Sequence, residues 1–437
     1  MSGTNSSSGN VNDHNDLERY VTVMLEGVQL PELSIIHERC IYRVPHRIHQ
    51  INQQAYTPRV VSIGPIHTPF RPGGDIRLKP MEELKLQYLK SFLNGANLSV
   101  GDCVSKLKVW EPDIRRCYAD PIQHNSDDFL RMVLIDACFI LELFLRYYSL
   151  QEWIERDPLF LKPWLAKDVM LDLILLENQL PFFVLKGLYN LAISAYVTAD
   201  FPSLVDIAFT YFEAHNEQNI RPENVYPLHF TDLLRTFMLP SSLNCRQPEK
   251  RVNIVEHLYC ASQLMEAGLV FEVSPSKCIL DLKYRKGVLT MPCFKVYSST
   301  EILLRNIVAF EQCHHPTLPY ITEYIKILDF LINTGKDVNI LVEKKTIVNL
   351  LGDEDALATM VNNLCSNVTL PYVRPDYGSL CDQLNGFYEN PRNKYKAIFI
   401  HDYFNTPWKI ASTIAAIVLL VLTFIQTICS IVTLFKQ

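Results

Sequence analysis

Residues 128–150 read DFLRMVLIDACFILELFLRYYSL, and residues 168–189 read DVMLDLILLENQLPFFVLKGLY. Both segments are apolar for most of their length but carry charged residues inside, among them Asp136 and Asp172. A charge at the depth of a bilayer is costly, so neither segment is expected to cross a membrane. We interpret both as central helices of a water-soluble core, and Pro181 is expected to end or kink the second.

Helical periodicity extends over much of the remaining chain. Residues 81–94 (MEELKLQYLKSFLN) place apolar residues on one side of a helix and charged residues on the other. The same spacing predicts helices over residues 301–313, 320–333, 338–351, 355–365 and 377–403. These segments together predict a mainly α fold with a compact helical body.

A different periodicity appears near the middle of the chain. Residues 279–284 and 288–291 alternate apolar and polar residues on either side of a short Arg-Lys-Gly turn. This pattern is typical of a β-hairpin, and residues 269–273 are a candidate third strand. We therefore predict a small antiparallel hairpin or meander attached to the helical body.

The C-terminal residues 410–435 read IASTIAAIVLLVLTFIQTICSIVTLF and contain no charged residue over 26 positions. A helix needs about 20 apolar residues to cross the hydrocarbon core of a bilayer. Trp408 and Lys409 lie at one edge of the segment and Lys436 at the other, where interfacial anchors are expected. The segment predicts one transmembrane helix, and the alternative is a buried core helix.

The N-terminal residues 1–16 are polar and lack an apolar core, so they are not expected to form a signal peptide. We predict a solvated, disordered tail there, followed by a helix over residues 17–30. The chain is thus predicted to contain a tail with a leading helix (1–29), a mostly helical domain (30–403) and a transmembrane helix (410–435).

Composition excludes some classes of function. The net charge is -6 and no basic domain stands out, so nucleic acid is not an expected partner. The twelve cysteines include no C-x-x-C pair, and several lie within apolar runs, as Cys138 does. Such cysteines are typical of small buried side chains in a reducing compartment, not of a disulfide framework.

Charges that flank the apolar C-terminal segment predict its orientation. Four basic residues lie within about 20 positions before it, and they are Arg392, Lys394, Lys396 and Lys409. Only Lys436 follows it among basic residues. The positive-inside rule therefore places the body in the cytosol, and the protein is expected to be a single-pass protein of the plasma membrane.

The sequence contains no G-x-S-x-G, G-x-x-x-x-G-K-[ST] or H-E-x-x-H motif. Four acidic residues in the central apolar segments could pair as the general acid and base of a hydrolase, and they are Asp136, Glu142, Asp172 and Glu177. On helices, such residues are more commonly buried carboxylates that bind Arg or backbone donors. We therefore expect no catalytic, cofactor-binding or metal site, and we predict that the protein is not an enzyme.

Two other local patterns could mark a site. His314 and His315 follow Glu311 and Cys313, but adjacent helical residues face different directions, so a helix C-terminus that favours imidazolium explains them better than a metal ion. The run YRVPHR at residues 42–47 could form a ligand surface or a structural loop that docks on the core.

Many segments in this order resemble a plant-specific family known as domain of unknown function 247. They are IYRVP (41–45), YTPRVVSIGPIH (56–67), MEELKLQYLKSFL (81–93), IDACFILELF (135–144), DLILLENQLPFFVL (172–185), LHFTDLLR (228–235), ASQLMEAGLVF (261–271), LDLKYRKGVLTMP (280–292), LLRNIVAFEQC (303–313), LINTGKDVNIL (331–341) and DYFNTPWKIASTIAAIVLLVLTFIQT (402–427). The resemblance implies a mostly helical body with a C-terminal anchor, and it implies no accepted enzymatic activity.

Some grass members of that family resemble pollen-side self-incompatibility determinants that recognise secreted peptides. This resemblance implies a recognition role with a protein or peptide partner. Such a receptor needs its body outside the cell, which conflicts with the charge-based orientation. Three Asn-x-Ser/Thr sequons, at Asn5, Asn97 and Asn367, would also matter only for an exposed body. The expected function is that of a membrane-anchored recognition or scaffolding protein.

Overall fold

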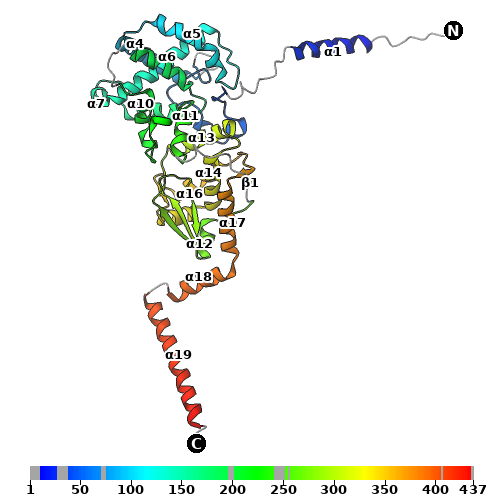
Figure 1. Cartoon of the computed structure of the whole chain (residues 1–437), viewed down its shortest axis with the longest axis vertical. Coiled ribbons are helices and arrows are strands. Elements are labelled where there is room, and N and C mark those ends of the chain that lie inside the picture. Colours follow the sequence, from blue (N-terminus) through cyan, green and yellow to red (C-terminus); the bar gives the residue numbers. More distant parts are fainter. Residues whose placement is uncertain are drawn as a thin grey trace, which may run out of the picture.

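The computed structural model describes residues 10–26, 38–69, 75–194, 201–240, 251–253, 256–404 and 407–434. Figure 1 shows an elongated, largely helical body, with the N-terminal helix α1 (Asn10–Glu26) lying apart from it and α19 (Pro407–Leu434) projecting from its far end. The predicted mainly α class is confirmed. Because α1 begins at Asn10, the prediction of a disordered tail over residues 10–16 is wrong, and residues 1–9 lie outside the described part.

The half of the body remote from α19 is organised around α6 (Ser126–Tyr148), one of the two central helices that the sequence predicts. Its N-cap Asn125 accepts a hydrogen bond from the Asp128 amide, which satisfies one of the free N–H groups at the helix start. The helices that pack on it are α4 (Lys79–Ala96), α5 (Val100–Arg116), α7 (Leu150–Trp153), α9 (Phe182–Ile193) and α10 (Leu204–Tyr211).

Shorter elements complete this half of the body. They are α3 (His46–His49), η1 (Gln53–Ala55), η2 (Ile76–Leu78), α8 (Pro163–Leu173), η3 (Glu213–His215), η4 (Pro222–Asn224) and α11 (Phe230–Met238). The second predicted central helix is therefore two helices, α8 and α9, with residues 174–181 between them. Pro181 stands at the N-cap of α9 and so bounds the second of these helices, whereas α8 already ends at Leu173.

The half nearer to α19 combines helices with short strands. Its helices are α12 (Ala261–Glu266), α13 (Thr300–His314), α14 (Tyr320–Leu331), α15 (Gly335–Glu343), α16 (Glu354–Leu364), α17 (Pro375–Glu389) and α18 (Pro391–Phe404). One continuous cluster of buried apolar side chains runs through both halves of the body.

The predicted hairpin is present as β3 (Lys283–Arg285) and β4 (Val288–Pro292), which are antiparallel. Lys286 and Gly287 have φ values of 50° and 84°, the conformation of a two-residue hairpin turn. The third strand, β2 (Val270–Ser274), pairs with β4 in parallel, so the predicted antiparallel meander is wrong in this strand. Residues 275–282 cross over and leave β4 in the centre, which strand alternation alone does not specify.

Two further strand pairs were not predicted. β1 (Val252–Asn253) pairs antiparallel with β7 (Tyr372–Val373), and β5 (Phe294–Val296) pairs in parallel with β6 (Ile347–Asn349). The predicted helix over residues 338–351 is therefore wrong beyond Glu343, where α15 ends. The turn that follows α15 includes Lys345 at a φ of 60°, which stops the helix and leads into β6.

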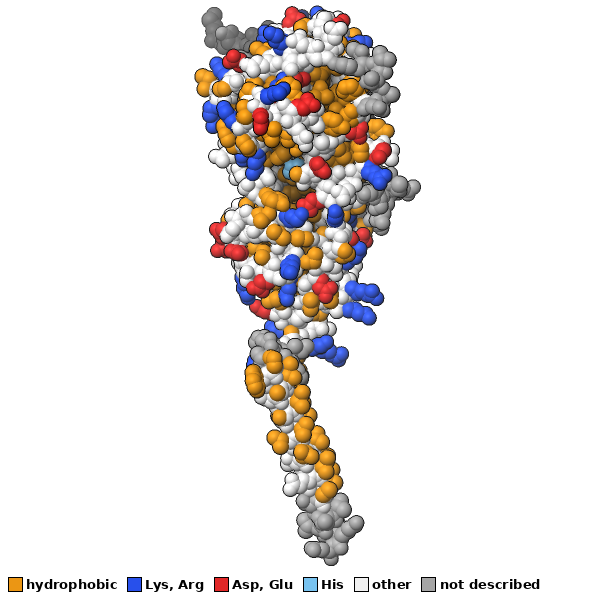
Figure 2. Space-filling view, turned by 90° about the vertical axis from the view of Figure 1, so that its left-hand side faces the viewer, with side chains coloured by type: hydrophobic (Ala, Val, Ile, Leu, Met, Phe, Trp, Pro, Cys, Tyr) orange, Lys and Arg blue, Asp and Glu red, His pale blue; other side chains and the backbone are white. Residues whose placement is uncertain are grey.

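The predicted helix over residues 377–403 is divided into α17 and α18 at Pro391, because proline does not continue a helix. After α18, the chain continues into α19. In the described part of the chain, α19 alone is long and apolar enough to cross a membrane, over Pro407–Cys429, and none of it is buried in the body. Figure 2 shows hydrophobic side chains along this projecting helix. A buried core helix, the alternative interpretation, is excluded by this exposure.

Candidate functional site

Residues 38–69 enter the body with little regular structure, since α3 and η1 are their main helical turns. Backbone amides without helical or sheet partners must find others when they are buried. Side chains from α6, from the end of α8 and from the connection between α8 and α9 supply these partners. Most of the acidic residues considered as catalytic candidates belong to this arrangement.

Asp172 receives three consecutive amides of this segment. Its carboxylate accepts hydrogen bonds from the backbone N–H groups of Arg59, Val60 and Val61, each at 2.8 Å. Burial raises the pKa of Asp172 to about 7, and the three N–H donors oppose that rise. This carboxylate therefore fixes the path of the backbone.

Glu177 and Asn178 extend the same arrangement. Glu177 Oε1 accepts the Val44 amide at 2.7 Å, and its Oε2 lies 2.9 Å from His67 Nε2. Asn178 Oδ1 accepts the Ile63 amide at 2.7 Å. Although burial opposes it, the His67 contact and the Val44 amide hold the pKa of Glu177 below its usual value.

Asp136 forms a buried ion pair with Lys85 at 2.7 Å and accepts the Gly64 amide at 2.8 Å. Lys85 also lies 2.6 Å from Glu82 and donates to the Ser62 carbonyl. Burial raises the pKa of Asp136 to about 6 despite the nearby ammonium group. The pKa of Lys85 is raised, because the two carboxylates outweigh its burial.

Glu142, the fourth candidate, lies in a separate network. Arg146 Nε donates to Glu142 at 2.8 Å, and Arg146 Nη1 donates to Asp157 at 2.6 Å. Tyr88 also donates to Asp157, at 2.7 Å. Each of the four candidate carboxylates is thus buried against an Arg, Lys, His or backbone donor, which is the arrangement expected of structural carboxylates.

Gly64 lies where this segment comes closest to the connection between α8 and α9. Its φ is +72°, and an added Cβ would lie 2.6 Å from the Gln179 carbonyl oxygen and 3.1 Å from the Tyr118 hydroxyl. We expect Gly64→Ala to lower the free energy of unfolding by about 3 kcal/mol, since backbone strain and overlap add. Chemical denaturation in detergent micelles measures this loss.

Gly386→Ala is the matched control. Gly386 is exposed inside α17, where an added Cβ meets no atom within 4 Å. This change should be neutral or stabilise the protein by up to about 1 kcal/mol. Equal stabilities of the two variants would contradict the close approach at Gly64.

The predicted histidine cluster lies at the C-terminal end of α13. His314 Nδ1 lies 2.9 Å from the Tyr42 hydroxyl, and Glu311 is bound to Arg235 at 2.8 Å. Burial is the main reason that the pKa of His315 is lowered to about 3, and nearby cationic groups lower it further. Within the described ranges, no group of three or more His, Cys, Asp or Glu residues could hold a metal ion.

His229 gives the fold a predictable pH dependence. It is buried, its Nε2 lies 2.9 Å from the Cys40 carbonyl oxygen, and burial lowers its pKa to about 3. The unfolded chain binds a proton near pH 6.5, so stability from this group is present above pH 6.5 and is lost as the pH falls. At pH 5 the loss relative to pH 7 is about 2 kcal/mol.

We expect His229→Asn, which retains a helix N-cap at this position, to reduce the fall in unfolding free energy between pH 7 and pH 5 by about that amount. Denaturation of both proteins at the two pH values measures the difference. His257→Asn, a change at an exposed histidine, is the control and should keep the wild-type fall. An unchanged fall in His229→Asn would contradict a neutral buried imidazole.

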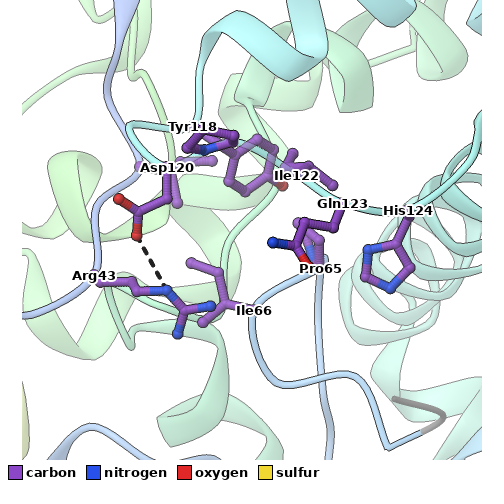
Figure 3. Close-up of a pocket in the computed structure, with 10 residues that line it drawn as sticks. Arg43, Pro65, Ile66, Tyr118, Asp120, Ile122, Gln123 and His124 are labelled. Carbon is purple, nitrogen blue, oxygen red and sulfur yellow. Dashed lines mark ion pairs between the residues drawn. The ribbon is translucent and has the colours of Figure 1, made fainter. Parts of the chain in front are cut away.

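A hollow opens beside residues 38–69. At this point, Ile41 forms a parallel bridge with Tyr118, which belongs to the connection between α5 and α6. The hollow has a volume of about 670 Å³, and its lining residues are Ile41, Arg43, Pro65, Ile66, Tyr118, Asp120, Pro121, Ile122, Gln123 and His124. Figure 3 shows the Arg43 and Asp120 side chains pointing toward each other at one side of it. Their ion pair is 3.1 Å long, with side chains about half exposed (50% and 58%).

A second hollow of about 420 Å³ adjoins the first through Arg43. It is lined by Arg43, Val44, His46, His49, Thr57, His67, Asp75, Leu78 and Glu177. We call the two hollows together the Arg43 groove. In an exposed ion pair, each charged side chain can leave the other and bind a charged or polar group of a peptide instead. The apolar and amide groups beside the pair can contact the rest of the peptide.

The run at residues 42–47 docks on the core, as one of the two interpretations predicts, and it also lines the Arg43 groove. Val44 is fixed from below by Glu177, while Arg43 and His46 line the groove. Sequence reasoning missed the opposite wall, residues 118–124. Their juxtaposition with Ile41 depends on contacts distant in sequence, and no local motif marks it.

A family model described as a plant protein of unknown function, DUF247, matches residues 41–422. The chain belongs to the DUF247 family. The match begins at Ile41, in the wall of the groove, and extends into α19. DUF247 membership thus covers the residues that hold the N-terminal segment and both walls of the Arg43 groove.

Two relatives from Arabidopsis thaliana are similar over nearly the whole DUF247 chain. The UPF0481 protein At3g47200 is 28% identical and covers 93% of this chain and 89% of its own length. The putative UPF0481 protein At3g02645 is 22% identical and covers 94% and 93%, respectively. No solved structure matches the chain.

Proposed function

We propose that this DUF247 protein is a membrane-tethered recognition or scaffolding protein that binds a protein or peptide partner in the Arg43 groove. The observation that carries the proposal is the groove itself, an open hollow with the exposed Arg43–Asp120 pair at its mouth. One wall comes from the connection between α5 and α6, helices that Figure 1 places at the end of the body opposite α19. A groove so placed can meet a partner without obstruction by the bilayer.

The chemistry of the groove favours a peptide over a small apolar ligand. Pro121 and Ile122 supply apolar surface, and Gln123 supplies an amide that can donate and accept hydrogen bonds. Its wall along residues 38–69 is held by buried carboxylates, so little backbone rearrangement is needed on binding. Such preorganisation reduces the entropy lost when a partner binds.

A hydrolase that uses Asp136, Glu142, Asp172 and Glu177 is the alternative function. The geometry gives it little support, because each carboxylate already accepts hydrogen bonds or ion pairs from the fold. A general base must reach the proton that it removes. Binding therefore accounts better than catalysis for the arrangement around these residues.

The recognition proposal is tested by reversing the polarity of the groove. The double variant R43D/D120R retains an ion pair between positions 43 and 120. It exchanges the positions of the positive and the negative charge. Proximity labelling in the native plant tissue should lose the partners that the wild type labels, while the melting temperature remains within a few degrees. The matched control R131D/D128R reverses an exposed ion pair of 2.9 Å on α6 and should keep them. Unchanged labelling by R43D/D120R would overturn the proposal.

We further propose that α19 crosses the plasma membrane with the body in the cytosol. Two observations support this orientation. Four basic residues precede the apolar segment 410–435, and the described cysteines of the body are free thiols. A role in cell–cell recognition or self-incompatibility is a narrower form of the proposal. In the cytosolic orientation, the protein would take part in such recognition at the cytosolic face of the membrane.

Glycosylation tests the orientation. Asn97 and Asn367 are exposed on the body, so their access to glycosyltransferases depends on the side of the membrane and not on burial. Asn5 lies outside the described residues. We expect glycosidase treatment of the plant-expressed protein to cause no shift in mobility, with the body digested when protease is added outside sealed cytosol-side-out vesicles. A glycosidase-sensitive shift that disappears in an N97Q/N367Q variant would refute the cytosolic body and favour a surface receptor.

A further inference from the structure

The helix α18 joins the body to α19 and packs on the body along one side only. Gly268, which follows α12, approaches Ala397 so closely that an added Cβ would lie 3.1 Å from the Ala397 Cβ. Ala397 and Asn393 thus mark the face of α18 that meets the body. In Figure 1, α18 runs at a steep angle to α19 at the base of the body.

The opposite side of α18 carries a stripe of aromatic residues. Tyr395, Phe399 and Tyr403 are spaced four residues apart, so they lie along one face of the helix. Their exposed fractions are 72%, 53% and 50%, and the rings of Phe399 and Tyr403 are 5.0 Å apart. Exposed aromatic side chains on three consecutive turns are unusual for a helix that faces water.

Basic side chains lie on the same helix as this stripe. Arg392, Lys394 and Lys396 are all exposed on the first turns of α18. Arg285 at the end of β3 and Lys286 in the turn that follows lie near the same end, because the neighbouring Gly287 packs against Phe387 of α17. Figure 2 shows Lys and Arg side chains gathered at the base of the body, next to the projecting helix.

Aromatic rings with basic residues beside a membrane-spanning helix match the chemistry of the headgroup layer. Tyrosine rings prefer the boundary between acyl chains and headgroups, and lysine and arginine bind lipid phosphates. Anionic lipids concentrate such basic segments at a membrane surface. The short link between α18 and α19 keeps the stripe close to any bilayer that holds α19.

We propose that α18 lies in the headgroup layer of the membrane that holds α19 and binds anionic phospholipid headgroups through Arg392, Lys394 and Lys396. The inference rests on the proposed anchoring by α19. It adds that the body is held against the lipid surface at a fixed angle.

Hydroxyl-radical footprinting of the full-length protein tests this contact. The protein is reconstituted in nanodiscs of phosphatidylcholine alone or with about one-third phosphatidylserine, and oxidation of Tyr395 and Tyr403 is measured by mass spectrometry. Oxidation of both should fall several-fold when phosphatidylserine is present. Tyr226, which is 78% exposed on the body, is the internal reference and should not change.

Charge variants separate headgroup binding from other causes. R392Q/K394Q/K396Q should abolish the phosphatidylserine effect, and K90Q/K106Q/K108Q, at exposed lysines of α4 and α5, should retain it. Equal oxidation in the two lipid mixtures would overturn the proposal. Protection in phosphatidylcholine discs by inorganic phosphate alone would also overturn it, in favour of a soluble anion. Failure of the protein to enter nanodiscs would instead refute the anchoring by α19.

Discussion

Replacing Lys85 with methionine is expected to lower the free energy of unfolding by about 3–5 kcal/mol. The Lys85 side chain is 2% exposed, and the change leaves the Asp136 carboxylate buried without its cation. The Ser62 carbonyl also loses the donor that Lys85 supplies. Because Asp136 holds the Gly64 amide, the damage should extend to the wall of the Arg43 groove. Urea denaturation of the purified protein in detergent micelles measures the loss.

The double variant K85M/D136N distinguishes a stranded charge from lost packing. The side-chain amide introduced at position 136 can still accept a hydrogen bond from the Gly64 N–H and carries no charge, so the double variant should recover more than half of the stability that K85M loses. K90M, at an exposed lysine of the same helix, should change the stability by less than about 0.5 kcal/mol. A double variant no more stable than K85M would contradict the buried-pair account.

Truncation after Phe404, which removes α19, should move nearly all of the protein from the membrane pellet to the supernatant after an alkaline carbonate wash. The α19 helix is apolar over a length sufficient to span a bilayer, and it contributes no residue to the buried core. The truncated body should therefore remain folded. The carbonate wash is needed because α18 alone would leave a salt-sensitive attachment to anionic lipid.

The full-length variant L420R provides the matched test within α19. A charge near the centre of the span should reduce insertion by opposing burial in hydrocarbon, whereas L420A should insert like the wild type. A truncated protein that stays in the carbonate-resistant pellet would contradict anchoring by α19. So would normal insertion of a variant with several arginines across the span.

The sequence predicts the helices well where periodicity and length agree. The apolar segment in α6 and the uncharged segment in α19 are both longer than the apolar stretches of ordinary surface helices. Their length and composition predict a central helix for the first and a transmembrane helix for the second. Pro181 and Pro391 act as boundaries, although the break at Pro391 was not predicted. By contrast, β6 follows α15 so closely that helical spacing hides it.

Contacts between residues that are distant in sequence are harder to predict than helices and strands. The alternation in β2 indicates a strand, but not that β4 is its parallel neighbour. Similarly, Asp172 is recognisable as a buried acid, whereas its three amide partners lie more than 100 residues earlier. The groove has the same origin, because Arg43 and Asp120 meet only after both segments have docked.

Photo-crosslinking from inside the Arg43 groove is the most direct test of a recognition role. A photoreactive phenylalanine at Gln123, an exposed residue that lines the groove, should form an adduct with a protein or peptide partner in the native tissue. The same group at Val109, which is 73% exposed on α5, should not form that adduct. The adduct from Gln123 should also disappear in the R43D/D120R background. No adduct from Gln123, or the same adduct from both positions, would contradict partner binding in the groove.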